Sequence, residues 1–185
     1  MKHYIMIDIE TKSTKNRAII AAFCALYFTD KDDTHSSLLV CLDCHEQKLM
    51  GRVTDGPTLK FWDDQPKWLQ ELVLKGSEPA YNAIRQLSDM VSNIRSSMSL
   101  EDEIVFIGNP PSFDQSKLED LMDNIGLVEY PWEHYEWVCL RTLRKQFNIQ
   151  KDDIEFTGTP HHPYDDCLHQ MKLFKLTQSV SQPAD

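Results

Sequence analysis

The chain has 185 residues, 41% of them hydrophobic and 26% charged, a composition typical of a globular domain with its own core and not of a disordered chain. Its formal net charge of −10 disfavours broad electrostatic binding to nucleic acid, but it does not exclude an enzyme that meets phosphate through bound metal. No apolar run is long enough to cross a bilayer and no signal-peptide pattern opens the chain, so we expect a cytoplasmic protein.

No linker, internal repeat or low-complexity segment divides the chain, so we expect a single domain over residues 1–180 and a short tail over residues 181–185. The five cysteines are an odd number and are expected to be reduced thiols. Cys41, Cys44 and His45 have the spacing of a haem or zinc motif. Because no second ligand pair and no export signal accompany them, we interpret both cysteines as strand residues.

The first predicted strand carries two acids. Residues 4–11 are apolar until Asp8 and Glu10, and because side chains alternate along a strand, both carboxylates point to the same side. Adjacent carboxylates repel each other unless a cation lies between them. The pair is therefore a candidate half-site for Mg²⁺ or Mn²⁺, which prefer oxygen ligands. Taken alone, the segment is explained equally well by a surface turn that carries two acids.

The rest of the chain predicts a mixed sheet flanked by helices, and thus an α/β fold. Strands are expected over residues 19–28, 38–42 and 104–107, and helices over residues 58–65, 78–98 and 133–147. The acidic run Asp30, Asp32 and Asp33 fits a solvated hairpin between the second and third strands. A tight turn over residues 108–112 precedes a helix with Asp114 near its start, where the helix dipole alone would favour an acid.

The last predicted helix begins at Pro163, a residue suited to a first helical turn, after a loop over residues 157–162. Asp165 and Asp166 lie in that first turn. The helix dipole explains one of them as a capping acid. Two adjacent acids repel, however, which favours a chemical role for at least one of the pair.

Four acids and one histidine recur at positions where α/β sheets place their sites, at strand ends or helix starts: Asp8, Glu10, Asp114, Asp166 and His161. Such a set meets the needs of two-metal phosphodiester hydrolysis. The acids would hold two cations about 3.5–4 Å apart. The histidine, whose ordinary pKa is near neutrality, would remove a proton from the attacking water.

These motifs resemble the DEDDh exonucleases, with D-x-E-T at residues 8–11 and H-x4-D at residues 161–166. Within that superfamily, the motifs resemble in most detail the small phage and bacterial stand-alone 3′-5′ exonucleases related to phage exonuclease A. It runs in order along nearly the whole chain, through F-W-D-D-Q at 61–65, G-N-P-P-S-F-D at 108–114, C-L-R-T-L at 139–143 and G-T-P-H-H-P-Y-D-D at 158–166. It implies a ribonuclease H-like fold and a bacterial or phage-encoded protein that acts in the host cytoplasm.

The resemblance also implies an activity: removal of nucleotides from the 3′ end of single-stranded RNA or DNA as 5′-monophosphates, with two Mg²⁺ or Mn²⁺ ions. Asp8, Glu10, Asp114 and Asp166 would be the metal ligands and His161 the general base, which the x4 spacing selects over His162. The matched segments imply substrate contacts by Thr11, Trp62, Gln65, Asn109, Phe113 and Arg141. For Trp62, a core position competes with stacking on the terminal base.

The chain departs from the family pattern at a few positions. Cys167 follows the last acid, where relatives have alanine, and Pro110 and Pro111 precede S-F-D. A catalytically silent protein-binding or nucleic-acid-binding factor on the same fold is the alternative, and the intact set of five residues counts against it. A structural metal-binding protein would explain the acids but not His161. RNA or DNA as substrate, Mg²⁺ or Mn²⁺ as metal, and a homodimer all remain open.

Overall fold

The computed structural model describes residues 1–31 and 35–181. Its centre is a five-stranded sheet of order β3-β2-β1-β4-β5, in which β1 pairs antiparallel with β2 and parallel with β4. The strands are β1 (Lys2–Thr11), β2 (Ile20–Thr29), β3 (His35–Cys41), β4 (Glu103–Gly108) and β5 (Trp137–Cys139). The expected positions of Asp32 and Asp33, and most of the expected tail, lie outside the described residues.

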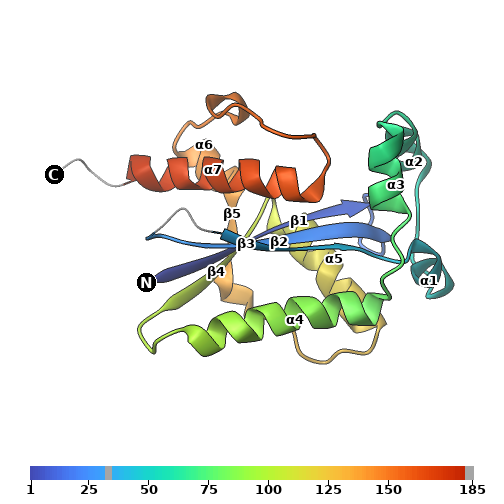
Figure 1. Cartoon of the computed structure of the whole chain (residues 1–185), viewed down its shortest axis with the longest axis horizontal. Helices are drawn as coiled ribbons and strands as arrows, with labels where there is room; N and C mark the ends of the chain where they lie inside the picture. The colour runs from blue at the N-terminus through green and yellow to red at the C-terminus, as the bar shows by residue number, and fades with distance from the viewer. Residues whose placement is uncertain (32–34, 182–185) are drawn as a thin grey trace.

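Helices cover both faces of this sheet (Figure 1). They are α1 (Cys44–Leu49), α2 (Gly56–Asp63), α3 (Lys67–Leu74), α4 (Ala80–Ser97), α5 (Pro111–Asn124), α6 (Leu140–Gln146) and α7 (Pro163–Ser181), with short 3₁₀ turns η1 (His134–Glu136) and η2 (Lys151–Asp153). In Figure 1, α6 and α7 lie above the sheet, α4 and α5 lie below it, and α2 and α3 stand at the end to which β1 points. The predicted α/β class with a mixed sheet is confirmed, and the arrangement is consistent with a ribonuclease H-like fold.

The alternation of β1 sends its side chains into two different cores. Ile5, Ile7 and Ile9 belong to the cluster that includes the buried residues of α4 and α5. Tyr4 and Met6 belong to the cluster on the other face, with Cys167, Met171 and Phe174 of α7. Asp8 and Glu10 follow Met6 at intervals of two residues, so their side chains point to the same face as Tyr4 and Met6. Both acids therefore emerge from β1 on the side that α7 covers.

One predicted helix was wrong over part of its length. Residues 133–147 form η1, strand β5 and helix α6 instead of a single helix. Trp137 pairs with Phe106 of β4, and the two rings stack with their centroids 5.4 Å apart. The apolar spacing identified α6, but the aromatic contact and the open edge of β4 turn the preceding residues into a strand.

Two short helices, α1 and α3, were not anticipated. Cys44 begins α1 and is therefore not a strand residue, although Cys41 ends β3 as expected. The side chain of Asp43 caps α1 by accepting hydrogen bonds from the backbone N–H groups of His45 and Glu46. A side-chain cap of this kind lets a helix of six residues form where apolar periodicity is too short to read.

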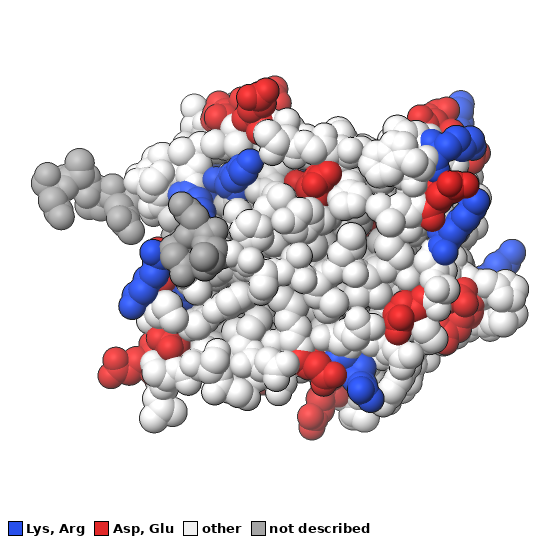
Figure 2. Space-filling view, viewed as in Figure 1, with Lys and Arg blue, Asp and Glu red and all other residues white. Residues whose placement is uncertain are grey.

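Charged residues are unevenly spread over the face seen in Figure 2. Its middle, over β3 and β2, is almost free of charged side chains, and small separate groups of Lys, Arg, Asp and Glu lie around its edges. This view shows no continuous basic stripe of the kind that binds nucleic-acid backbone over a broad surface. Within the part of the chain that the structure describes, no helix is both long and apolar enough to span a membrane.

Candidate active site

The predicted acids meet at one end of the sheet. β1 and β4 run parallel, so Glu10, near the end of β1, and Asp114, in the first turn of α5 after β4, approach from neighbouring strands. Asp166, in the first turn of α7, comes from above them. The ligand atoms of Glu10, Asp166 and His161 lie within 4.8 Å of one another. This end of the sheet is where α/β folds place their sites.

Electrostatics link all four acids. Burial raises the pKa of Asp8 well above its ordinary value, and the charges of Asp114 and Asp166 raise it further. Burial likewise raises the pKa of Glu10, with added repulsion from the other three carboxylates. Burial raises the pKa of Asp114 to about 7 and that of Asp166 to about 6. Oxygen donors that repel one another in this way fit a site for divalent cations.

Hydrogen bonds fix three of these acids in place. The side chain of Gln170 donates to Asp8 Oδ1 at 2.7 Å, the backbone N–H of Asn109 donates to Asp114 Oδ2 at 2.9 Å, and that of His161 donates to Asp166 Oδ2 at 2.8 Å. A Cβ at Gly108 would lie 3.1 Å from Asp114 Oδ2 and 2.9 Å from Pro111 Cα. The glycine of the G-N-P-P-S-F-D segment is therefore needed to bring Asp114 against the sheet.

The adjacent acids Asp165 and Asp166 have different roles. Asp165 Oδ2 accepts a hydrogen bond from the backbone of Thr159 at 2.8 Å and lies 3.6 Å from His162 Nδ1. A Cβ at Gly158, where φ is +111°, would come within 2.6 Å of the same oxygen. Asp165 thus holds the loop that precedes α7, which leaves Asp166 to face the other acids.

His161 and His162 also diverge. His161 has φ 66°, in the left-handed region that a non-glycine residue adopts at a cost, and its ring packs edge-on against Phe61 with centroids 4.8 Å apart. Burial lowers the pKa of His161, and the charge of Lys151 lowers it further. His162 instead has its ring directed at Asp165. The structure therefore brings His161, and not His162, to the acids.

A cavity of about 340 Å³ opens beside Glu10, and Thr11, Phe61, Trp62 and Phe113 are among its lining residues. Trp62 contributes little surface because it is 1% exposed, and its Nε1–H donates to the carbonyl of Thr11 at 2.9 Å. Its ring packs in a core cluster with the side chains of α3. The expectation that Trp62 stacks on a base conflicts with this burial. Phe61 is 37% exposed and occupies the accessible position.

Three further residues predicted to contact substrate, Gln65, Arg141 and Phe113, have contacts within the protein. Gln65 donates to the carbonyl of Phe61 at 3.1 Å, so it braces the end of α2. Arg141 is exposed and donates to the carbonyl of Asn109 at 3.1 Å. Phe113 has one face covered by Lys117, whose Nζ lies 3.6 Å from the ring centroid. Gln65 and Arg141 thus contact backbone at the edge of the site.

Sequence reasoning missed several residues that the geometry brings to the site. Gln170 lies four residues after Asp166 on α7, so helical periodicity would have placed both on one face. Lys117 follows Asp114 by three residues on α5 and is only 2% exposed. Lys151, on η2, had no sequence signal, because only the folding of the loop between α6 and α7 brings it near the acids.

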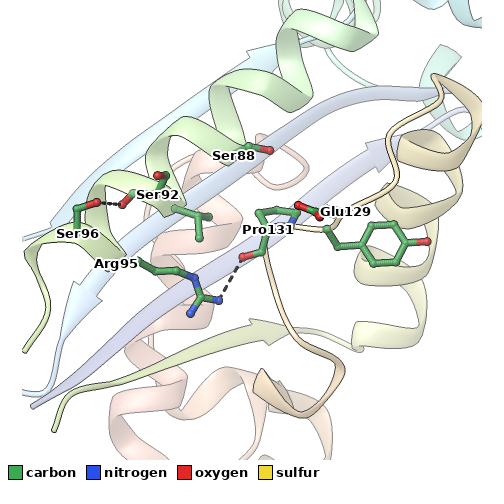
Figure 3. Close-up of a pocket in the computed structure, with 8 residues that line it drawn as sticks. Ser88, Ser92, Arg95, Ser96, Glu129 and Pro131 are labelled. Atoms are coloured by element: carbon green, nitrogen blue, oxygen red, sulfur yellow. Dashed lines mark hydrogen bonds between the residues drawn. The ribbon is translucent and has the colours of Figure 1, made fainter. Parts of the chain in front are cut away.

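A separate cavity of about 530 Å³ lies between α4 and the segment that contains Glu129 and Pro131 (Figure 3). Several of its polar groups are already paired. Arg95 donates to both carboxylate oxygens of Glu136 and to the carbonyl of Pro131, and the Ser96 hydroxyl donates to the carbonyl of Ser92. This cavity therefore offers no set of free groups that would compete with the acids as a reactive site.

The mixed sheet with converging acids at the ends of β1, β4 and the start of α7 is consistent with a nuclease of ribonuclease H-like fold. The model of the 3′-5′ exoribonuclease Rv2179c-like domain matches residues 3–178, and the chain belongs to this family. Its activity class is accordingly that of a hydrolytic 3′-5′ exonuclease, with nucleic acid as substrate. No curated protein matches the chain.

Proposed function

We propose that this chain removes nucleotides from the 3′ end of single-stranded nucleic acid, releasing 5′-monophosphates, by the DEDDh arrangement of the exonucleases related to phage exonuclease A. The convergence of Asp8, Glu10, Asp114 and Asp166 carries the proposal. The charges of Asp114 and Asp166 raise the pKa of Asp8, and the charges of all three raise the pKa of Glu10. RNA is the favoured substrate because the family model describes an exoribonuclease. The five unpaired cysteines agree with action in the cytoplasm.

The four acids would hold two Mg²⁺ or Mn²⁺ ions. Such ions, when bound, lower the pKa of a water molecule and offset the charge that develops on the scissile phosphate. Burial raises the pKa of Asp114 to about 7 and that of Asp166 to about 6, so bound cations would favour the ionised form of both groups near neutral pH. Gln170 orients Asp8 through its hydrogen bond, and Asn109 and His161 orient Asp114 and Asp166.

His161 is proposed as the general base. Its lowered pKa keeps the imidazole neutral at pH 7, so that a ring nitrogen is free to accept a proton from water. The edge-on contact with Phe61 limits rotation of the ring. The same contact couples the base to the cavity beside Glu10, which we propose receives the terminal nucleoside between Phe61 and Phe113.

The direct test is incubation of the protein with 5′-labelled single-stranded RNA and DNA, with and without Mn²⁺. We expect a ladder of progressively shorter labelled strands, with nucleoside 5′-monophosphates as the released product, and faster decay of RNA. The Asp8→Asn variant is the matched control and should leave the strands intact. Internal cleavage, 3′-monophosphate products or equal decay in EDTA would each contradict the proposal.

Phe61→Ala is expected to weaken binding of single-stranded substrate by about 1–3 kcal/mol, the usual contribution of one aromatic ring stacked on a base. Since Phe61 is 37% exposed, the melting temperature should change little. The matched variant Trp62→Ala removes a buried ring and should lower the free energy of unfolding by about 3–5 kcal/mol. Fluorescence anisotropy and thermal scans separate the two effects. A stable Trp62→Ala protein with weak binding would restore Trp62 as the stacking residue.

A further inference from the structure

Helix α2 forms one wall of the cavity beside Glu10, and the end of β1 with the turn after it forms another. In Figure 1, α2 stands at the end of the sheet to which β1 points. The lining residues from these two segments are Pro57, Thr58, Phe61 and Trp62 of α2, and Ile9, Glu10, Thr11 and Thr14 of β1 and its turn. The width of the cavity therefore depends on how α2 is held against this turn, which comprises residues 12–17.

Few side chains anchor α2 to the rest of the protein. Of its eight residues, all of which the structure describes, only Trp62 is buried. The Nε1–H group of Trp62 donates to the carbonyl of Thr11 at 2.9 Å, which fixes the last turn of the helix. Phe61, in the same turn, packs against His161 but is 37% exposed. A helix with so little buried surface needs a second attachment at its other end to keep a fixed place.

Asp55, the residue that caps α2, supplies this second attachment. Its Oδ1 accepts a hydrogen bond from the backbone N–H of Thr58 at 2.8 Å, the ordinary contact of a helix cap. Its Oδ2 accepts one from the backbone N–H of Thr14 at 2.9 Å, across to the turn after β1. The backbone N–H of Asp55 also donates to the carbonyl of Lys12 at 3.0 Å. One carboxylate therefore joins the first turn of α2 to the opposite wall of the cavity.

Both oxygens of Asp55 are used, and both are needed. Hydrogen bonds from the backbone and side chain of Thr58, from the side chain of Ser13 and from the backbone of Thr14 hold the pKa of Asp55 well below its ordinary value. An ionised carboxylate has two accepting oxygens, whereas an amide has one. Ser13 is fully buried and its carbonyl accepts a hydrogen bond from the Thr11 hydroxyl at 2.8 Å, so the turn that Asp55 binds is itself held to β1.

We propose that Asp55 is a positioning residue, which joins α2 to the turn after β1 and so sets the width of the cavity that receives the terminal nucleoside. The inference rests on the proposed function, in which this cavity binds the 3′-terminal nucleotide. Without the bond from Thr14, the first turn of α2 keeps only the backbone contact of Asp55 with Lys12, and the wall that carries Phe61 can shift. Asp55 does not itself line the cavity, so its effect is on nucleotide binding and not on the chemical step.

The test is binding of 5′-AMP in the presence of Mn²⁺, measured by isothermal titration calorimetry, because this product fills the terminal cavity and needs no turnover. Asp55→Asn has one accepting oxygen and cannot keep both contacts. Since Asn caps helices about as well as Asp, the contact with Thr14 is the one expected to break. The affinity for 5′-AMP should fall by about 3- to 10-fold, the scale of one lost hydrogen bond to a charged group at a partly solvated position. KM for single-stranded RNA should rise by a similar factor, with a smaller change in kcat.

Asp43→Ala is the matched control. Asp43 caps α1 by accepting two backbone hydrogen bonds, at 2.7 and 3.0 Å, and does not line the cavity. Asp43→Ala and Asp55→Ala should each lower the melting temperature by about 2–4 °C, the usual effect of one lost helix cap in a chain of this size. Only Asp55→Ala should also weaken 5′-AMP. The rise of melting temperature with Mn²⁺ should equal that of the wild type in every variant, because the four acids are unchanged.

Hydrogen exchange followed by NMR reports the contact itself. The Thr14 amide should exchange faster in Asp55→Asn than in the wild type, while the Thr58 amide stays protected. Wild-type affinity for 5′-AMP in Asp55→Asn would overturn the inference, and so would an equal loss of affinity in Asp43→Ala. A wild-type protein that binds 5′-AMP but releases no mononucleotides from RNA would refute the proposed function separately, because neither binding nor exchange requires turnover.

Discussion

Replacing His161 by alanine is expected to slow mononucleotide release by about 10²–10⁴-fold, the usual contribution of a general base. The ring lies among Glu10, Asp166 and Phe61, so its loss removes the proton acceptor and leaves the carboxylates in place. Binding of Mn²⁺ should survive, because hard cations are held by oxygen donors without imidazole. The measurement is the rate of 5′-monophosphate release at saturating strand, together with the shift of melting temperature on adding Mn²⁺.

His162→Ala is the matched control and should leave turnover nearly unchanged, since that ring is directed at Asp165. The pair of readouts also separates two roles for His161. If His161→Ala abolished the thermal shift with Mn²⁺, His161 would be a metal ligand beside Glu10 and Asp166, and not a base. Greater damage from His162→Ala than from His161→Ala would overturn the assignment.

The pH dependence of turnover offers a related observable. A base works only when unprotonated, and burial lowers the pKa of His161 below its ordinary value. As the pH is lowered, kcat should therefore decline at a lower pH than it would if the base were a histidine of ordinary pKa. We call this part of the pH profile its acidic limb. Lys151→Met removes a positive charge that contributes to the lowered pKa, so this limb should move towards higher pH. A limb that does not move would show that another group controls it.

The sequence alone predicted the position of a side chain or helix correctly where a short-range rule determines the local geometry. Alternation along β1 placed Asp8 and Glu10 on one side of the strand, and the structure has both facing α7. Proline and acids marked the start of α7 at Pro163. In each case the signal lies within a few neighbouring residues, and tertiary contacts reinforce the local preference instead of opposing it.

Other features depend on contacts that the sequence does not display. Trp62 is buried because α3 packs on it, and α3 has no clear signal of its own. Trp137 joins the sheet because its ring stacks on that of Phe106 in β4. A cavity of about 390 Å³ forms where the loop that carries Lys151 lies beside α7. Motif spacing therefore identified the acids, whereas the surfaces that would contact a substrate required the packed structure.

In the absence of divalent metal, the free energy of unfolding is expected to fall as pH rises from about 4 to about 7. Folding raises the pKa of Asp114 from 3.8 to about 7 and that of Asp166 from 3.8 to about 6. Within this window the folded state binds more protons than the unfolded state, so stability decreases with pH. Well above pH 7, Asp114 and Asp166 are ionised in both the folded and the unfolded state, so the contribution of these two groups becomes constant.

Asp8→Asn should reverse much of that loss. The amide removes one buried charge next to Asp114 and Asp166, and its oxygen can still accept the hydrogen bond from Gln170. At pH 8 in EDTA the variant should melt several degrees above the wild type, because about 1 kcal/mol corresponds to about 2–4 °C in a chain of this size. Asp89→Asn, an exposed acid on α4, should change little, since surface pairs contribute little.

Millimolar Mn²⁺ should raise the melting temperature of the wild type and do so more strongly at pH 8 than at pH 5, because only ionised carboxylates bind the cation. Asp8→Asn should lose most of this shift together with nuclease activity, although it is the more stable protein without metal. Differential scanning calorimetry at both pH values, with EDTA or Mn²⁺, provides the comparison. A wild type whose stability is flat between pH 4 and 7 and indifferent to Mn²⁺ would show that the four carboxylates do not form a cation site.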